Sequence, residues 1–181
     1  MSIETWQLDT THSTIGFTVR HMVVAKVHGR FRRYEGRLFV SGDLTKAQAE
    51  VKIDAASLDT QVEARDTHLR SQDFFDVAAF PRVIFRSRRV EAAGANRYRV
   101  VGDLTVRDTT REVVLETELL GRVKDPFGAE RLAFTARTSI DRKDFGLVWN
   151  KPLETGGVLV GERVDIELDV QAVKAVAEKA A

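Results

Sequence analysis

The sequence contains no cysteine among its 181 residues, which excludes disulfides, thiol chemistry and cysteine-ligated zinc sites. It also lacks any apolar run approaching the roughly 18 residues that a membrane span needs, so we expect no transmembrane segment. The start of the chain, from Met1 to Trp6, has neither the basic residues nor the apolar centre of a signal peptide. We therefore expect a cytoplasmic protein, or a periplasmic one if a leader has been removed.

The chain also has little net charge and few polar aromatic residues. The chain carries 28 basic and 27 acidic side chains, for a net charge of +1, so nothing favours a nucleic-acid partner electrostatically. Only two Tyr and two Trp accompany ten Phe. Any internal cavity would therefore be strongly apolar and would suit a hydrocarbon-like ligand better than a sugar or a nucleotide.

Motifs that carry polar chemistry are sparse too. The sequence has no nucleophile elbow and no phosphate-cradling glycine loop. The histidines are scattered without metal-ligand spacing, so we expect no metal site: His12, His21, His28 and His68. We expect no cofactor and no enzymatic activity. One alternative stays open, a small enzyme that acts on a lipid-like substrate through Arg65, Asp66 or His68.

The sequence is rich in alternating segments that predict β-strands. Ile15, Phe17 and Val19 share one face of the first clear example, and similar segments recur to the end of the chain. Residues 27–41 read as one long strand with a β-bulge near Arg32 and Arg33. Closing an amphipathic sheet on itself buries its apolar face and removes its edges. The pattern predicts an all-β fold with a single antiparallel barrel of about eight strands, and a two-sheet sandwich remains the competing architecture.

One stretch interrupts the strands, Ser57 to Asp76. Thr60 and Glu63 have the spacing of a capping box, and Asp66 precedes Arg70 by the four residues of a helical ion pair. These signals predict one short helix near residues 61–71. Because short helices are marginal alone in water, we expect this helix to pack on the barrel.

The presumed inner faces of the strands mix small side chains with large ones. A solid core of alternating sizes and an open cavity both fit this mixture. The small side chains are Gly36, Ala47, Ala49, Gly102 and Ala136, with Thr117 and Thr138.

Ordered motifs along the chain resemble those of YceI-like proteins. The resemblance runs from about Trp6 to about Val170, and its pieces are Trp6-Gln-Leu-Asp9, His12-Ser13, Phe17-x-Val-Arg-His-Met22, Ser57-Leu-Asp-Thr60, Asp73-Phe-Phe-Asp76 and Arg142-x-Asp-Phe-Gly-Leu-x-Trp-Asn150. Asp108 departs from the pattern, because the family more often has glycine there, and this difference affects only turn geometry.

The resemblance implies a lipocalin-like barrel, a homodimer, and a cavity that binds a polyisoprenoid chain such as a quinone tail. We expect this barrel over residues 1–173, with a flexible tail over 174–181, and non-enzymatic storage or transport of the lipid. The expected apolar lining is Phe17, Val19, Phe31, Leu69, Phe74, Phe75, Phe85, Phe134, Phe145, Leu147, Trp149 and Ile166. The expected polar end of the pocket is Arg65, Asp66, His68 and Asn150.

Overall fold

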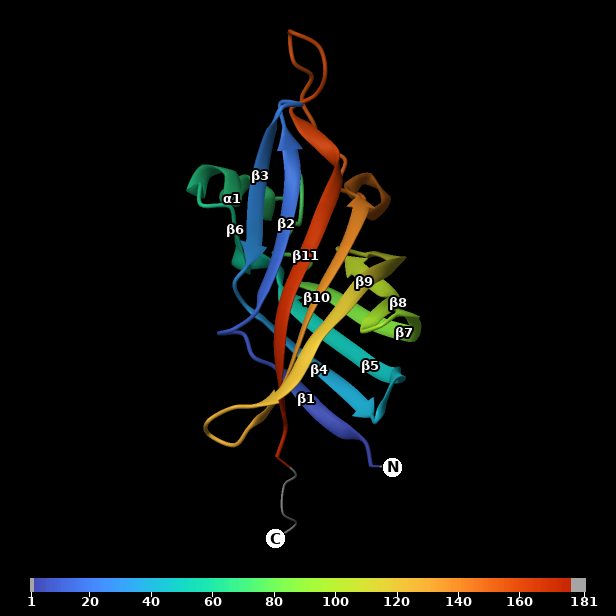
Figure 1. The fold of residues 1–181 in the computed structure, drawn as a ribbon. Helices are drawn as coiled ribbons and strands as arrows, with labels where there is room; N and C mark the ends of the chain where they lie inside the picture. Colours follow the sequence, from blue (N-terminus) through green and yellow to red (C-terminus); the bar gives the residue numbers. More distant parts are fainter. Residues whose placement is uncertain (1, 177–181) are drawn as a thin grey trace.

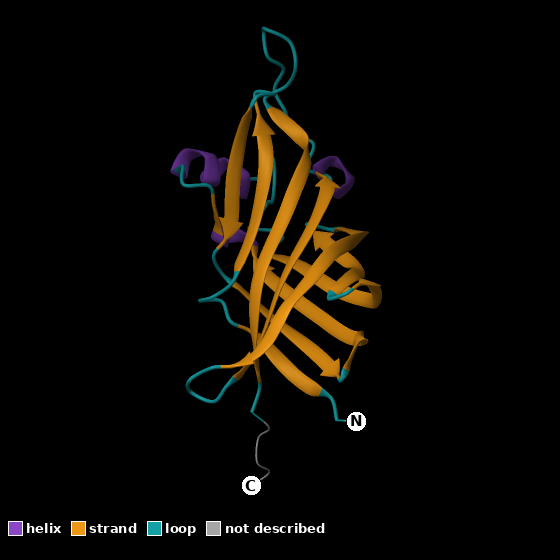
Figure 2. Cartoon of the chain, in the orientation of Figure 1, coloured by secondary structure: helices purple, strands orange, loops and turns teal. Residues whose placement is uncertain are grey.

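A computed structural model describes residues 2–176 of the chain. Strands dominate it, with one α-helix and two short 3-10 helices (Figure 2). In chain order the elements are β1 (Glu4–Leu8), β2 (Thr14–His21), β3 (Ala25–Phe31), β4 (Tyr34–Ser41), β5 (Asp43–Asp54), η1 (Ala55–Ser57), β6 (Leu58–Asp59), α1 (Glu63–Arg70), β7 (Arg82–Gly94), β8 (Arg97–Val106), β9 (Thr109–Lys124), β10 (Glu130–Asp141), η2 (Arg142–Phe145) and β11 (Val160–Lys174).

Eight strands close into an antiparallel barrel, as the strand pattern predicts. Their order is β1-β4-β5-β7-β8-β9-β10-β11, and β11 pairs back onto β1. The closing contact sets Trp6 opposite Lys174, and Trp6 is fully buried. Within residues 2–176, no helix combines the length and the hydrophobicity needed to cross a membrane.

The sheet continues past the barrel on one side of β11. The C-terminal part of β11 pairs with β1, whereas its N-terminal part pairs with β2, which in turn carries β3 and β6. In Figure 1 this extension rises above the barrel beside α1. The barrel therefore has a taller wall at the end where α1 lies.

The prediction of one long strand over residues 27–41 is wrong. The chain leaves β3 at Phe31 and enters β4 at Tyr34, so the two halves join different parts of the sheet. The backbone N–H of Arg32 donates to the Ser57 carbonyl at 3.1 Å, and that of Arg33 donates to the Ser57 hydroxyl at 3.0 Å. Because these bonds point toward η1, the connection is a corner and not a bulge.

The helix α1 forms where it was predicted, but different contacts hold it. Its N-cap is Val62, which makes no side-chain capping bond, so the capping-box prediction is wrong. The Thr60 hydroxyl instead donates to the Asp66 carboxylate at 2.5 Å. The Arg70 guanidinium does not pair with Asp66 either, and donates to carbonyls of η1 and β6 at 2.9 and 3.2 Å. These bonds fasten α1 to the wall of the barrel.

The apolar core consists of two clusters. The larger one lies on the α1 side and includes Phe74, Phe85 and Phe145 among its buried members. The smaller one gathers Trp6 and Leu132 with two more buried residues where β1 closes onto β11.

The C-terminal strand runs slightly farther than expected. Lys174 belongs to β11, and its ammonium contacts the carboxylates of Glu4 at 2.7 Å and Glu130 at 3.3 Å. Lys174 therefore belongs to the barrel and not to the tail predicted over 174–181. Residues 177–181 lie outside the described part of the chain, so a flexible tail there stays a prediction.

Candidate functional site

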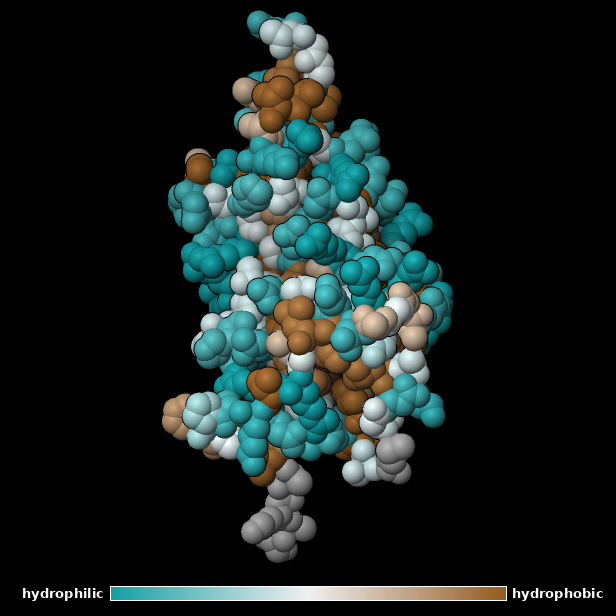
Figure 3. All heavy atoms as spheres, viewed as in Figure 1, coloured by the Kyte–Doolittle hydropathy of each residue, from teal (hydrophilic) through white to brown (hydrophobic). Residues whose placement is uncertain are grey.

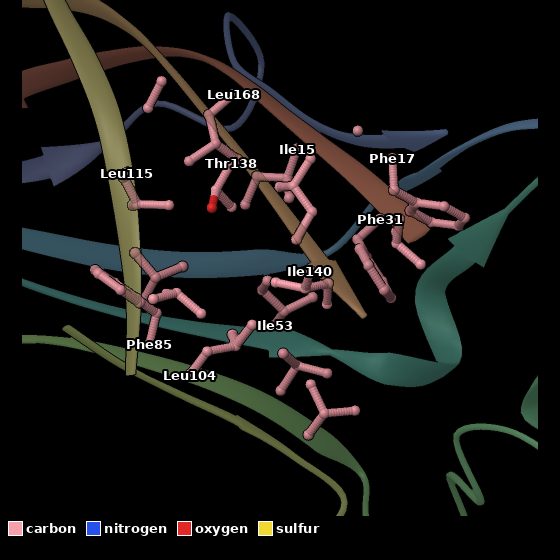
Figure 4. Close-up of a pocket in the computed structure, with 18 of the residues that line it drawn as sticks. Ile15, Phe17, Phe31, Ile53, Phe85, Leu104, Leu115, Thr138, Ile140 and Leu168 are labelled. Atoms are coloured by element: carbon pink, nitrogen blue, oxygen red, sulfur yellow. The ribbon is translucent and has the colours of Figure 1, made fainter. Parts of the chain in front are cut away.

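The barrel encloses a cavity of about 710 Å³. Figure 4 shows side chains from β2, β3, β5, β7, β8, β9, β10 and β11 pointing into the same space, Ile15, Phe85 and Leu168 among them. Known ligand pockets usually measure about 300–1,000 Å³. The mixture of small and large inward side chains fits either a solid core or a cavity. In this barrel it leaves open space.

The cavity is long and narrow. Its lining on β11 extends from Val160 to Val170, and at about 3.3 Å per strand residue this wall spans about 33 Å. A volume of about 710 Å³ spread along such a wall is an elongated space, which suits an extended hydrocarbon chain better than a compact ligand.

All twelve apolar residues that were expected to line the cavity do contribute to its wall. Inward positions carry Phe85 and Phe134 on the barrel strands and Phe17 on β2 of the extension, because alternate residues of a strand share one face. Sequence reasoning missed much of the wall near β1. That part comprises Leu8, Leu38, Val40, Leu44, Leu119 and Leu132, and the same alternation could have identified it.

Aromatic side chains surround the cavity near α1. The Phe31 ring centroid lies 5.6 Å from that of Phe17 and 5.8 Å from that of Phe75, and the Phe74 and Trp149 centroids are 5.4 Å apart. We call these five residues the aromatic collar. Edge-to-face and tilted arrangements of this kind are favourable for aromatic pairs.

A glycine makes room for the collar. A Cβ atom on Gly29 would lie 2.2 Å from the ring of Phe17, far inside contact distance. Gly29 is paired with Phe17 across β2 and β3, so the ring lies over the backbone of the neighbouring strand. This close approach requires glycine at position 29.

The charged groups of the lining are all basic and lie around the α1 end. Among the described residues that line the cavity, none is Asp, Glu or Lys, and those with basic or imidazole side chains are Arg20, His21, Arg65, His68 and Arg142. The Arg65 guanidinium donates to the Thr60 hydroxyl at 2.7 Å and to the Thr60 carbonyl at 2.9 Å. The imidazole Nε2 of His68 lies 2.8 Å from an Asp73 carboxylate oxygen. The cavity thus has an apolar bore and one polar end.

Two residues expected at the polar end do not line the cavity. Asp66 is buried and accepts bonds from the backbone N–H and the hydroxyl of Thr60. Asn150 bonds to the backbone of Val160, donating to its carbonyl at 2.7 Å and accepting from its N–H at 3.0 Å. Both side chains therefore fasten the segments around the cavity mouth, and Arg65 and His68 are the predicted polar residues that reach the space itself.

Arg142 is a lining residue that the sequence reasoning did not select. Its guanidinium is buried and donates to the carbonyls of Leu147, Trp149, Val160 and Gly161 at 2.6–3.2 Å. Burial lowers the pKa of this guanidinium, although Glu162 and Asp141 oppose the shift. Its motif, Arg-x-Asp-Phe-Gly, gave no sign of this role because the carbonyl partners come from an irregular segment.

The three residues considered for acid–base chemistry do not form one unit. Arg65 and Asp66 both bond to Thr60, whereas His68 pairs with Asp73. The His68 ring packs edge-on against Phe74 and Trp149, with centroids 5.1 and 4.5 Å away. In residues 2–176, no group of three or more His, Asp or Glu side chains is placed to hold a metal ion.

A family model for the YceI-like domain matches residues 6–172. The chain belongs to the YceI-like family. A UPF0312 protein of Staphylococcus epidermidis is 34% identical to it over 168 residues, which cover 92% of this chain and 95% of that relative. The resemblance expected from the ordered motifs is thereby confirmed.

Two solved structures share this fold. Burkholderia cenocepacia BcnA superposes with a TM-score of 0.80 at 21% identity, over 91% of this chain and 98% of BcnA. A polyisoprenoid binding domain from Saccharophagus degradans superposes with a TM-score of 0.71 at 14% identity, over 94% of this chain and 98% of that domain. At these identities the likeness establishes the lipocalin-like barrel alone.

Proposed function

We propose that this YceI-like barrel binds one polyisoprenoid chain, such as the tail of a quinone or a polyprenyl lipid, for storage or transport and without converting it. The observation that carries the proposal is the bore, about 710 Å³ in volume and walled almost wholly by apolar side chains. The ligand that the Saccharophagus degradans domain is named for has the shape and chemistry that this space fits.

The dimensions of the bore suit a chain of several isoprene units. Four C–C bonds of about 1.5 Å advance an extended chain by roughly 5 Å per unit. Strands tilt by about 35–45° in a barrel, so about 33 Å of strand corresponds to roughly 25 Å of bore, which accompanies about five units. Burying one five-carbon unit contributes about 4 kcal/mol before the cost of ordering the chain. Because ordering the ligand offsets part of this gain, affinity should rise with chain length until the bore is full.

The head group, in this proposal, lies at the α1 end. Arg65, His68 and Arg142 line the cavity there, and they could donate hydrogen bonds to a quinone carbonyl or to an anionic group. The tail would extend toward the cluster around Trp6 at the opposite end. The aromatic collar would lie beside the first isoprene units.

A titration with quinones of increasing isoprenoid length tests the proposal. Trp149 lines the cavity, whereas Trp6 is buried in the second cluster, so a Trp6→Phe variant leaves one indole to report on the bore. We expect saturable quenching at one quinone per chain, with affinity increasing with tail length. Quenching that is unrelated to tail length, or no saturation at all, would refute the proposal.

The homodimer implied by the family resemblance also belongs to this proposal, as does location in the cytoplasm or, after loss of a leader, the periplasm. Several large apolar side chains are exposed at the end of the barrel opposite α1, among them Leu120, Val123 and Phe127, and they offer apolar surface for assembly. Sedimentation equilibrium distinguishes a mass of two chains from a mass of one.

A further inference from the structure

The hairpin between β2 and β3 exposes apolar side chains beside the cavity mouth. Met22, Val23 and Val24 form its turn and are 48%, 56% and 78% exposed. Val158, which is also exposed, lies in the neighbouring loop before β11. We call these four residues the apolar tip. Figure 3 shows hydrophobic atoms gathered where the hairpin meets this loop at the end of the molecule.

Local contacts hold the apolar tip in place. The Met22 backbone N–H donates to the Leu159 carbonyl at 2.9 Å, and His21 pairs with Val160 across β2 and β11. A Cβ atom on Gly157 would lie 3.0 Å from a methyl group of Val23. The hairpin and the loop before β11 are therefore one joined surface.

The backbone of the turn is unfavourable for the residues that occupy it. Met22 and Val23 both have positive φ, 51° and 68°, a conformation that favours Asn or Gly and is rare for a β-branched side chain. Asn-Gly would suit this turn better and would also be polar. The sequence thus places exposed apolar side chains here at the expense of local stability, and such strain is typical of functional positions.

The lining of the cavity reaches this surface. Arg20, His21, Leu159 and Val160 line the cavity and adjoin the apolar tip in sequence. Exposed residues of the cavity wall also occur at the start of α1, where Val62 is 46% exposed. A ligand that enters or leaves at the α1 end therefore passes next to the tip.

Basic residues flank the tip. Arg20 and Lys26 lie on the two strands of the hairpin, and Lys151 lies in the neighbouring loop. That loop also carries one acidic side chain, Glu154. The nearby Glu162 is paired with Lys143. Basic side chains around exposed apolar groups are the combination that binds an anionic lipid surface.

We propose that the apolar tip docks the barrel onto an anionic lipid bilayer, with the cavity mouth facing the membrane. Apolar side chains would enter the boundary between head groups and acyl chains, while the flanking basic residues contact lipid phosphates. A docked barrel would take up the isoprenoid from the bilayer, and this part of the inference rests on the proposed function. Docking itself can be measured without any isoprenoid.

Vesicle flotation tests the docking. The double variant Met22→Asn/Val23→Gly removes two of the four apolar side chains of the tip and relieves the backbone strain, so its melting temperature should equal or exceed that of the wild type. We expect the wild type to float with phosphatidylglycerol vesicles, and the double variant to partition at least tenfold more weakly, which is about 1.4 kcal/mol. Ile3→Ser, which removes a 69% exposed side chain just before β1 and away from the tip, should leave flotation unchanged.

Several results would overturn the inference: a wild type that does not float, equal partitioning of the wild type and the double variant, or a tip whose substitution dissociates a dimer without changing flotation. Quinone binding in detergent micelles separates this inference from the proposed function. If the chain binds quinone in micelles but does not float with vesicles, the docking proposal alone is refuted. If the chain floats with vesicles but binds no quinone, the proposed function alone is refuted.

Discussion

Filling the bore is the perturbation that most sharply separates a hollow barrel from a packed one. Ala49 lines the cavity on β5. It pairs with Leu38, which pairs with Trp6 across β4 and β1, so it lies toward the end opposite α1. The substitution Ala49→Phe adds a phenyl ring at this position.

The two pictures of the interior predict opposite effects on stability. In a well-packed core an added ring forces strain and costs about 1–3 kcal/mol. In a bore of about 710 Å³ the ring takes up roughly 100–200 Å³, counting about 30 Å³ for each added group the size of a water molecule. We therefore expect the free energy of unfolding without ligand to stay equal or to rise by up to about 1 kcal/mol through added apolar burial.

The same variant should shorten the ligand that the barrel accepts. An added phenyl ring is about as long as one extended isoprene unit, roughly 5 Å, so it should block about one to two units of the bore. Affinity for a long-tailed quinone should fall at least tenfold, or about 1.4 kcal/mol, while affinity for a short-tailed one stays unchanged. Denaturant unfolding and the quinone titration measure the two effects.

A matched control is Lys46→Phe, because Lys46 lies on β5 with its exposed side chain directed away from the bore. This control should change neither the preferred tail length nor the stability by more than about 0.5 kcal/mol. A loss of more than about 1 kcal/mol in Ala49→Phe alone, without any change in tail preference, would refute the hollow interior.

Three further predictions follow from particular contacts. Gly29→Ala should displace the Phe17 ring and weaken quinone binding, and adding Phe17→Leu should restore part of it; the titration above measures both. Several interactions hold the pKa of Asp9 well below its ordinary value, and the largest is the hydrogen bond from the Thr11 hydroxyl. Asp9→Asn should therefore lower the free energy of unfolding by about 1.5–3 kcal/mol at neutral pH. Because the folded-state pKa is lowered, this stabilisation is fully present above the unfolded value near 3.9. It is lost progressively as the pH falls from there toward the folded-state value, so in urea titrations the cost should shrink steadily below about pH 3.9. Arg142→Met leaves buried carbonyls without a donor and should cost roughly 3 kcal/mol or more, whereas the same change at an exposed arginine should cost less than about 0.5 kcal/mol in the same assay.

The barrel could be predicted from sequence because its strands obey a local rule. Phe17, Phe85, Phe134 and Ile166 all occupy alternating apolar positions, and each of them lines the cavity. Alternation determines which face of the strand a side chain takes, and an amphipathic sheet must bury its apolar face. Every apolar residue selected in this way reaches the bore, although alternation alone does not reveal whether the bore is empty.

What could not be predicted depends on hydrogen bonds that follow neither the helix nor the strand period. Arg142 looks like a surface residue until the carbonyls of Trp149 and of Gly161 in β11 are brought together around it. Thr60 fits a capping box locally, yet its hydroxyl is used by Asp66 in the folded chain. The corner at Arg32 and Arg33 depends on Ser57. In each case a polar group satisfied by tertiary contacts overrides a local pattern.

The central claim is that a single isoprenoid chain occupies the bore, and a native mass spectrum of the purified protein tests it most directly. The account predicts a discrete adduct with the mass of one isoprenoid lipid per chain, or its appearance after incubation with a long-tailed quinone, and its loss after extraction with organic solvent. Bare protein before and after that incubation would contradict the account.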